Sequence, residues 1–128
     1  MAVSDSKQIS VIAGATFAEG ALYSGVTLDS SGHAVLPNTT DVGGRIIGTL
    51  YGVTSTTGSA GSQALPIGVG PVVKVQMAAS TLSAGDPVGF STAGLGIAPT
   101  TDAPTFGMIL VGSSGAAGRV FSVIRTGD

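Results

Sequence analysis

Residues 81–99 read TLSAGDPVGFSTAGLGIAP, and residues 16–37 read TFAEGALYSGVTLDSSGHAVLP. The two stretches place turn-forming residues in the same order, although the apolar residues between them differ. The aligned positions are Thr16 with Thr81, Gly20 with Gly85, Gly32 with Gly94 and Pro37 with Pro99, with three extra residues between the glycines of the first copy. Gly permits positive φ and Pro presets the turn, so shared positions predict shared turns. The pattern predicts one bent β-ribbon built twice.

The similarity continues after each stretch. The run Gly48–Gly52 (GTLYG) resembles Gly107–Gly112 (GMILVG), and each is followed by a small polar loop and an apolar run, Leu65–Val69 or Val120–Ile124. Two copies are too few for a solenoid, which generally needs three or more repeats. We therefore expect an N-terminal arm at residues 1–7 and a single β domain at residues 8–128, with repeat units at about 9–73 and 74–128.

Short apolar runs separated by turn sequences occur along the whole chain, which is typical of an all-β sandwich or barrel. With 21 Gly and six Pro residues, long helices are disfavoured, because Gly and Pro cost a helix about 1 and about 3 kcal/mol relative to Ala. The sequence predicts an all-β, barrel-like domain of two similar halves with little or no helix. The expected strands are Gln8–Ala13, Ala21–Tyr23, Val26–Leu28, His33–Leu36, Arg45–Val53, Ala64–Val69, Val72–Gln76, Val88–Phe90, Gly96–Ala98, Phe106–Val111 and Arg119–Arg125.

Charged residues are scarce, at 9% of the chain against an average near 25%. The formal net charge is -2, and the five Lys and Arg residues are scattered, so the chain lacks the basic stripe of a nucleic-acid binder. No run approaches the roughly 20 apolar residues of a membrane-spanning helix. The 29 Ser and Thr residues can hydrate a surface without charge, while a net charge near zero favours association. We expect an assembly component made in the cytoplasm, with neither nucleic acid nor membrane as a partner.

Residues suited to catalysis are few: one His, one Glu, six Asp and no Cys. Asp29, a neighbouring Ser and His33 could be written as a Ser–His–Asp trio, but Ser30–Gly32 is a turn sequence and His33 is more simply the first residue of the next strand. Transition metals need several His or Cys ligands and calcium needs clustered carboxylates, whereas Asp41, Asp86 and Asp102 stand apart. The sequence predicts no enzyme activity, no cofactor and no metal.

Three cations adjoin or interrupt apolar strands. Arg45 and Arg119 each begin a long apolar run, and Lys74 interrupts another. In a chain with so few charges, these residues are candidates for ion pairs with a partner. The simpler alternative is that they are solvated strand ends.

The stretch AGDPVGFSTAG-LGIAP, its counterpart EGALYSGVTLDSSGHAVLP and the Gly48–Leu50 and Gly107–Ile109 strands resemble the bacteriophage head decoration, or capsid cement, proteins. The AGD turn also resembles that of β-clip domains, the fold class of the phage lambda decoration protein. The resemblance implies a β-clip-like protein that binds the outside of an expanded phage head as a homotrimer and holds the major capsid protein against internal pressure. Its expected location is the virion.

In that family an N-terminal arm often docks on the capsid by adding a strand. The matching residues are Ala2, Val3, Ser4, Asp5, Ser6 and Lys7, which could bind by β-augmentation. Together with Arg45 and Arg119 they form the set of candidate capsid contacts.

Two other functions fit parts of the sequence. A carbohydrate-binding or receptor-binding module of a phage tail or fibre would suit the β-rich, Ser/Thr-rich surface, although two Tyr and no Trp leave few aromatic platforms. An accessory domain of a β-clip enzyme would suit the AGD turn alone. It predicts a fusion partner or a neighbouring catalytic gene.

Overall fold

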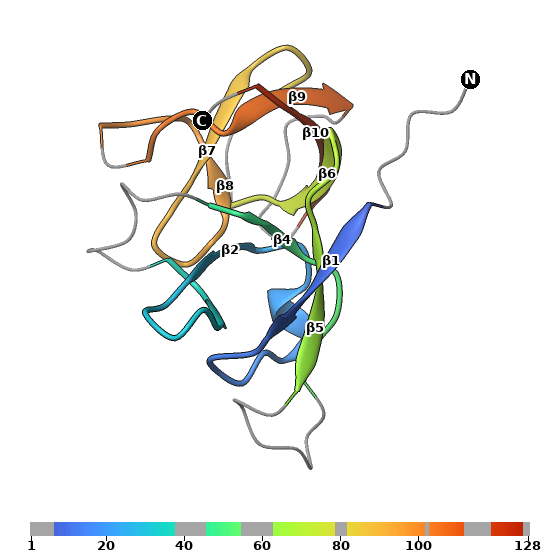
Figure 1. Cartoon of the computed structure of the whole chain (residues 1–128). Coiled ribbons are helices and arrows are strands. Elements are labelled where there is room, and N and C mark those ends of the chain that lie inside the picture. The colour runs from blue at the N-terminus through green and yellow to red at the C-terminus, as the bar shows by residue number, and fades with distance from the viewer. Residues whose placement is uncertain are drawn as a thin grey trace.

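The computed structural model describes residues 7–37, 46–54, 63–78, 82–101, 103–111 and 119–126. In these ranges ten strands form two antiparallel five-stranded sheets, and the helical residues are those of one 3-10 helix, η1 (Glu19–Ala21). Figure 1 shows β2, β1 and β5 of one sheet below β7, β9 and β10 of the other. The all-β fold predicted from the sequence is confirmed.

The two sheets have the same connectivity. The first has the order β1-β5-β4-β2-β3 and the second β6-β10-β9-β7-β8, which is the same order with every number raised by five. We call residues 8–68 the first half and residues 72–125 the second half. The strands are β1 (Gln8–Ile12), β2 (Gly25–Leu28), β3 (Ala34–Val35), β4 (Gly48–Leu50), β5 (Ala64–Gly68), β6 (Val72–Gln76), β7 (Pro87–Phe90), β8 (Gly96–Ile97), β9 (Gly107–Val111) and β10 (Val120–Arg125).

Strand registers match between the halves except at one β-bulge, where Ser122 of β10 pairs with Val111 and Val123 pairs with Ile109. Leu50 pairs with Ile67 as Ile109 pairs with Val123, and Val26 pairs with Gly48 as Val88 pairs with Gly107. The isolated bridge Ala13–Ala34 likewise corresponds to Met77–Gly96. Each residue of a strand in one half therefore has an identifiable equivalent in the other.

The turns correct one detail of the sequence alignment. Gly32 and Gly94 are equivalent as expected: both have positive φ, 79° and 80°, and they donate their N–H groups to the Asp29 and Ser91 carbonyls. The equivalent of Gly85 is not Gly20, however, but Tyr23. Tyr23 and Gly85 both have positive φ, and their N–H groups donate to the equivalent carbonyls of Leu50 and Ile109. The extra residues of the first copy precede Tyr23, where η1 lies.

Two further expectations differ from the structure. The run Ala21–Tyr23 is not a strand, because Ala21 ends η1 and the next two residues form a turn. The barrel-like closure is absent as well: β1 and β3 are the edges of the first sheet, and β6 and β8 are those of the second. Each of the other ten expected runs contains a strand. The chain passes from the first sheet to the second between Gly68 and Val72, just before the expected division at 73/74.

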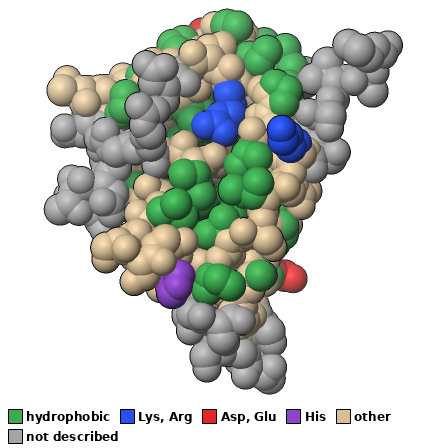
Figure 2. Space-filling view, in the orientation of Figure 1, with side chains coloured by type: hydrophobic (Ala, Val, Ile, Leu, Met, Phe, Trp, Pro, Cys, Tyr) green, Lys and Arg blue, Asp and Glu red, His purple; other side chains and the backbone are tan. Residues whose placement is uncertain are grey.

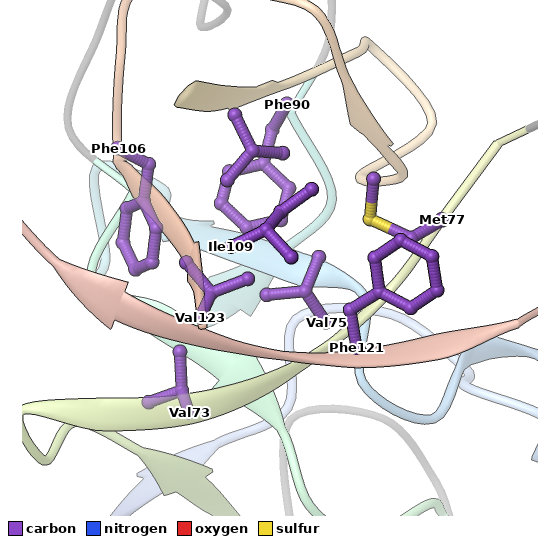
Figure 3. Packing of buried hydrophobic residues seen from close by; sticks show 9 residues of the cluster. Val73, Val75, Met77, Phe90, Phe106, Ile109, Phe121 and Val123 are labelled. Carbon is purple, nitrogen blue, oxygen red and sulfur yellow. The ribbon is translucent and has the colours of Figure 1, made fainter. Parts of the chain in front are cut away.

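Each half has its own hydrophobic core. The first consists of Ala13, Phe17, Val26, Ala34, Leu50, Leu65 and Ile67. Figure 3 shows the second, which consists of Val73, Val75, Met77, Val88, Phe90, Phe106, Ile109, Phe121 and Val123. In this second core the Phe90 and Phe106 rings meet edge to face, with centroids 4.9 Å apart. Alternate side chains along the strands point inward, and on each sheet they pack into a separate core.

The halves meet where the start of β2 packs on the turn between β7 and β8. The Gly25 N–H donates to the Gly94 carbonyl at 2.8 Å. A Cβ atom on Gly25 would lie 2.7 Å from the Phe90 ring, and one on Gly94 would lie 2.7 Å from the Gly25 carbonyl oxygen and 3.1 Å from Leu36. The two backbones can approach this closely because neither glycine has a side chain.

Two tyrosines of the first half cover the outer edge of β6. The Gln76 N–H donates to the Tyr23 carbonyl at 2.9 Å, and the Lys74 N–H donates to the Tyr51 hydroxyl at 2.9 Å. The two tyrosine rings meet edge to face at 5.3 Å, and the Lys74 Nζ lies 5.8 Å from the Tyr23 ring centroid. The exposed N–H groups of an edge strand are therefore satisfied inside the chain.

Arg125 provides a third link between the halves. Its Nη1 donates to the Ile47 carbonyl of the first half at 3.1 Å, and its guanidinium lies 4.8 Å from the Phe106 ring centroid. Burial lowers the pKa of Arg125 from its ordinary value, but an arginine keeps its charge at neutral pH. Ile46, beside the accepting residue, packs against the second core. The segment before β4 is thereby held to the second half.

We predict that Gly25→Ala lowers the free energy of unfolding by about 1–3 kcal/mol, because the new methyl group would overlap the Phe90 ring in a packed core. Gly20→Ala is the matched control, since a Cβ atom there has nothing within 4 Å. Urea denaturation followed by circular dichroism measures both. Equal stability of the two variants would contradict the close packing at Gly25.

We predict that Arg125→Ala costs about 1–3 kcal/mol of unfolding free energy, because it removes a charged hydrogen bond and a cation–π contact that join the halves. The control is Arg119→Ala, because Arg119 is exposed and surface substitutions usually stay within about 0.5 kcal/mol. Thermal unfolding by calorimetry compares them. A cost for Arg125→Ala no larger than that of the control would show that this link is dispensable.

Candidate interaction surface

The titratable side chains form turns instead of a reactive cluster. The Asp29 Oδ1 accepts hydrogen bonds from the N–H groups of Ser31 at 2.8 Å and His33 at 3.0 Å. The His33 N–H is the main cause of a lowered pKa at Asp29. Asp29 thus caps the turn that leads into β3, as the turn interpretation of the sequence predicted.

Neither a metal site nor a membrane-spanning helix occurs in the described ranges. No group of three or more His, Cys, Asp or Glu residues there could hold a metal ion. None of the helical residues described forms a helix long and apolar enough to cross a membrane.

Two of the predicted contact residues can be placed. Lys7 is exposed just before β1, and its carbonyl accepts the Val69 N–H at 3.0 Å, which extends the pairing of β1 with β5. Arg119 is exposed just before β10, and its carbonyl accepts the Met77 N–H at 2.8 Å. Both side chains are left for solvent or a partner. Residues 2–6 and Arg45 lie outside the described residues.

Large apolar side chains are exposed on both sheets. Five of them have exposed fractions between 40% and 47%: Ile9, Leu28, Met108, Leu110 and Val120. On β9, Met108 and Leu110 flank the buried Ile109, so they lie on the face of the sheet opposite the second core. Ile124 of β10 is paired with Met108 and is only half-buried. The outer face of the second sheet therefore carries adjacent apolar side chains.

Charged residues are few in the chain as a whole, at 9%. Figure 2 shows one face of the molecule, on which hydrophobic side chains lie among uncharged polar atoms and the Lys and Arg side chains gather in the upper part. Single exposed apolar residues are ordinary, but neighbouring ones on a protein surface indicate an interaction site. The surface is suited to covering by another protein.

The sequence reasoning did not single out Met108 and Leu110. The signal that could have found them is the uninterrupted apolar run GMILV at residues 107–111. A strand that is apolar on both faces is usually covered on both. Among the described residues, β9 packs one face on the second core and leaves Met108 and Leu110 of the other face exposed.

Comparison of the chain with protein-family models, curated proteins and solved structures gives no match. Function is therefore inferred from the residues and their geometry.

Proposed function

We propose that this chain is a capsid decoration protein that binds the outer surface of a phage head and stabilises it against internal pressure. Its partner is the major capsid protein, it works in the virion as a homotrimer, and it performs no catalysis. The observation that supports the proposal is a surface typical of an assembly subunit, which exposes large apolar side chains on both sheets in a chain with few charges. The family resemblance of the turn-rich stretches points to the same function.

Such a surface favours permanent assembly for a physical reason. Burying a charge in an interface carries a large desolvation cost, whereas burying apolar or hydroxyl-bearing side chains does not. One copy of a small domain makes limited contact, but subunits that bind together on a shell gain avidity. A decoration protein needs this combination of weak single contacts and many copies.

The candidate capsid contacts remain residues 2–7, Arg45 and Arg119. Lys7 and Arg119 are exposed and directly precede β1 and β10, so rigid strands fix their backbones. An arm of residues 2–7 contributes hydrogen bonds worth about 0.5–1.5 kcal/mol each, which three linked arms would multiply.

A carbohydrate-binding module is less well supported. Tyr23 and Tyr51 are half-buried and packed edge to face against each other at the junction of the two halves. Stacking on a sugar needs an open aromatic face. These two rings, which are all the tyrosines of the chain, are engaged in holding the fold.

We expect the purified protein to bind expanded, undecorated heads assembled from the major capsid protein encoded in the same genome. Sedimentation should show saturable binding at micromolar protein, and the decorated heads should withstand a higher temperature before rupture. Deleting residues 2–7 or introducing Arg119→Ala should weaken binding by about tenfold or more, since each removes contacts worth about 1 kcal/mol per subunit.

The control for charge and folding is Glu19→Gln, which removes an exposed charge of η1 and belongs to neither segment. It should bind the heads as the unmodified protein does. Absence of binding by the unmodified protein at micromolar concentration would overturn the proposed function.

A further inference from the structure

The two halves of the chain contact each other through surfaces that are not equivalent. The first half contributes what we call the β4 face, which consists of Tyr23, Ser24, Gly25, Leu36, Thr49 and Tyr51. The second half contributes the β6 face, which consists of Lys74, Gln76, Phe90 and Gly94. The hydrogen bond from Arg125 to the Ile47 carbonyl is a further contact outside these two faces. A contact between different surfaces of two similar units is heterologous, or head to tail.

The strand registers identify the equivalent of each face on the other half. The equivalent of the β4 face, on the second half, is the β9 face, which consists of Gly85, Asp86, Pro87, Ala98, Met108 and Leu110. Leu110 is included because it follows Ile109 as Tyr51 follows Leu50, although a β-bulge shifts the pairing of β9 with β10 beyond Ile109. The equivalent of the β6 face, on the first half, is the β1 face, which consists of Ser10, Ile12, Leu28 and Gly32. If the halves were joined by a two-fold axis, the β1 and β9 faces would also be in contact within the chain.

Burial shows that these two equivalent faces are free. Phe90 and Gly94 are buried, whereas Leu28 and Gly32 at the same positions of the first half are exposed. A Cβ atom on Gly32 would meet nothing within 4 Å. Thr49 is fully buried, whereas its equivalent Met108 is 40% exposed. The β4 and β6 faces are therefore covered at the junction, whereas their equivalents, the β9 and β1 faces, are exposed.

The exposed apolar residues fall mainly on these free faces. Leu28 belongs to the β1 face, and Met108 and Leu110 belong to the β9 face. Ile9 and Val120 are the members of the exposed set that lie outside both faces. Ile9 alternates along β1 with Ser10 and Ile12, so its side chain is on the opposite side of the strand.

The free edge of β1 has the hydrogen-bonding pattern that the junction needs. The Met77 N–H donates to Arg119 beside β10, and the preceding N–H, of Gln76, points outward to the Tyr23 carbonyl. In the first half the Ala13 N–H donates to Gln63 beside β5. Alternation along a strand then directs the Ile12 N–H outward. In a contact between copies, the Ile12 N–H would donate to the Gly85 carbonyl of the other copy, which is equivalent to the Tyr23 carbonyl.

The side chains at the centre of the contact are complementary in size. Within the chain the large Phe90 ring packs against Gly25, which has no side chain. Between copies, Leu28 would take the place of Phe90 and Pro87 would take the place of Gly25. The smaller Leu28 side chain leaves room for the larger Pro87 side chain. Pro87 has no N–H and cannot repeat the Gly25–Gly94 hydrogen bond. The contact between copies would therefore depend on apolar packing and the β1 edge.

We propose that copies of this chain associate head to tail, with the β1 face of one copy packed on the β9 face of the next, repeating the contact that joins the halves inside each chain. Heterologous contacts close into rings when the rotation allows it, and a ring of three copies would contain six halves. Asp86, whose carboxylate accepts the Ser83 N–H, is the one charged residue of the two faces, so apolar packing has to outweigh the desolvation of a single carboxylate. This self-association is independent of binding to a capsid.

Analytical ultracentrifugation of the protein alone tests the proposal. The unmodified chain should form a discrete oligomer at concentrations up to about 100 µM. Leu28→Lys on one face and Leu110→Lys on the other should each weaken association by about tenfold or more, because either places an unpaired charge in the contact. The matched control Val120→Lys changes an equally exposed side chain outside both faces and should associate normally.

Disulfide cross-linking tests the direction of the contact, because the chain has no native Cys. A Cβ atom on Gly25 would lie 2.9 Å from the Phe90 Cγ, so Cys residues at the equivalent positions 28 and 87 should reach the Cβ separation of about 3.5–4.5 Å that a disulfide requires. A mixture of the single variants Leu28→Cys and Pro87→Cys should give a cross-linked dimer on oxidation, and neither variant alone should do so.

Three results would overturn the proposal: a monomer at about 100 µM, dissociation by Val120→Lys as strong as that by Leu28→Lys, or a cross-linked dimer from either single Cys variant, which would show a two-fold contact. Circular dichroism confirms that each Lys variant is folded, and a second variant on each face (Ile12→Lys and Met108→Lys) replaces any that is not. Loss of capsid binding with intact self-association would leave this inference standing.

Discussion

The close approach of Gly25 to Gly94 is the constraint on which the rest of the structure depends. Each half is a small open sheet with its own core, and a unit of this size buries too little surface to be more than marginally stable alone. The backbone hydrogen bond between these glycines brings Phe90 over β2 and places the first-half tyrosines beside β6. The junction thereby covers one edge strand and completes the surroundings of the second core.

The two copies of the ribbon have diverged at the positions that the junction uses. The same positive-φ turn contains Tyr23 in the first half and Gly85 in the second. A residue other than Gly costs about 1 kcal/mol or more in this conformation. Tyr23 offsets that cost because its carbonyl accepts the Gln76 N–H and its ring packs against Tyr51. Gly85 is exposed and makes no such contact within the described part of the chain. As a glycine, it adopts the same conformation with little strain.

The sequence predicted most of the local structure and little of the arrangement. Alternation and turn residues located nearly every strand. The Gly32 and Gly94 turns were predicted correctly because positive φ favours glycine, which is visible in the sequence. The strand at Ala21–Tyr23 and the pairing of Gly20 with Gly85 were wrong, because three extra residues form η1 and no periodicity marks so short an insertion. Barrel closure was also wrong, because alternation shows which residues share a face but not whether edge strands pair. Exposure of Leu28 and burial of Phe90 depend on the junction, which no local pattern encodes.

The two proposals divide the surface between them. Head-to-tail association would cover the β1 and β9 faces, which hold Leu28, Met108 and Leu110. Lys7 and Arg119 are exposed, belong to neither face and stay available for a shell. A ring built in this way presents every arm in the same direction, because a rotation axis relates all copies identically. The apolar faces would then fix the geometry of the oligomer, while the arms and cations would determine where it docks. Such a separation explains how a chain with so few charges can associate with itself and still bind one partner in a defined orientation.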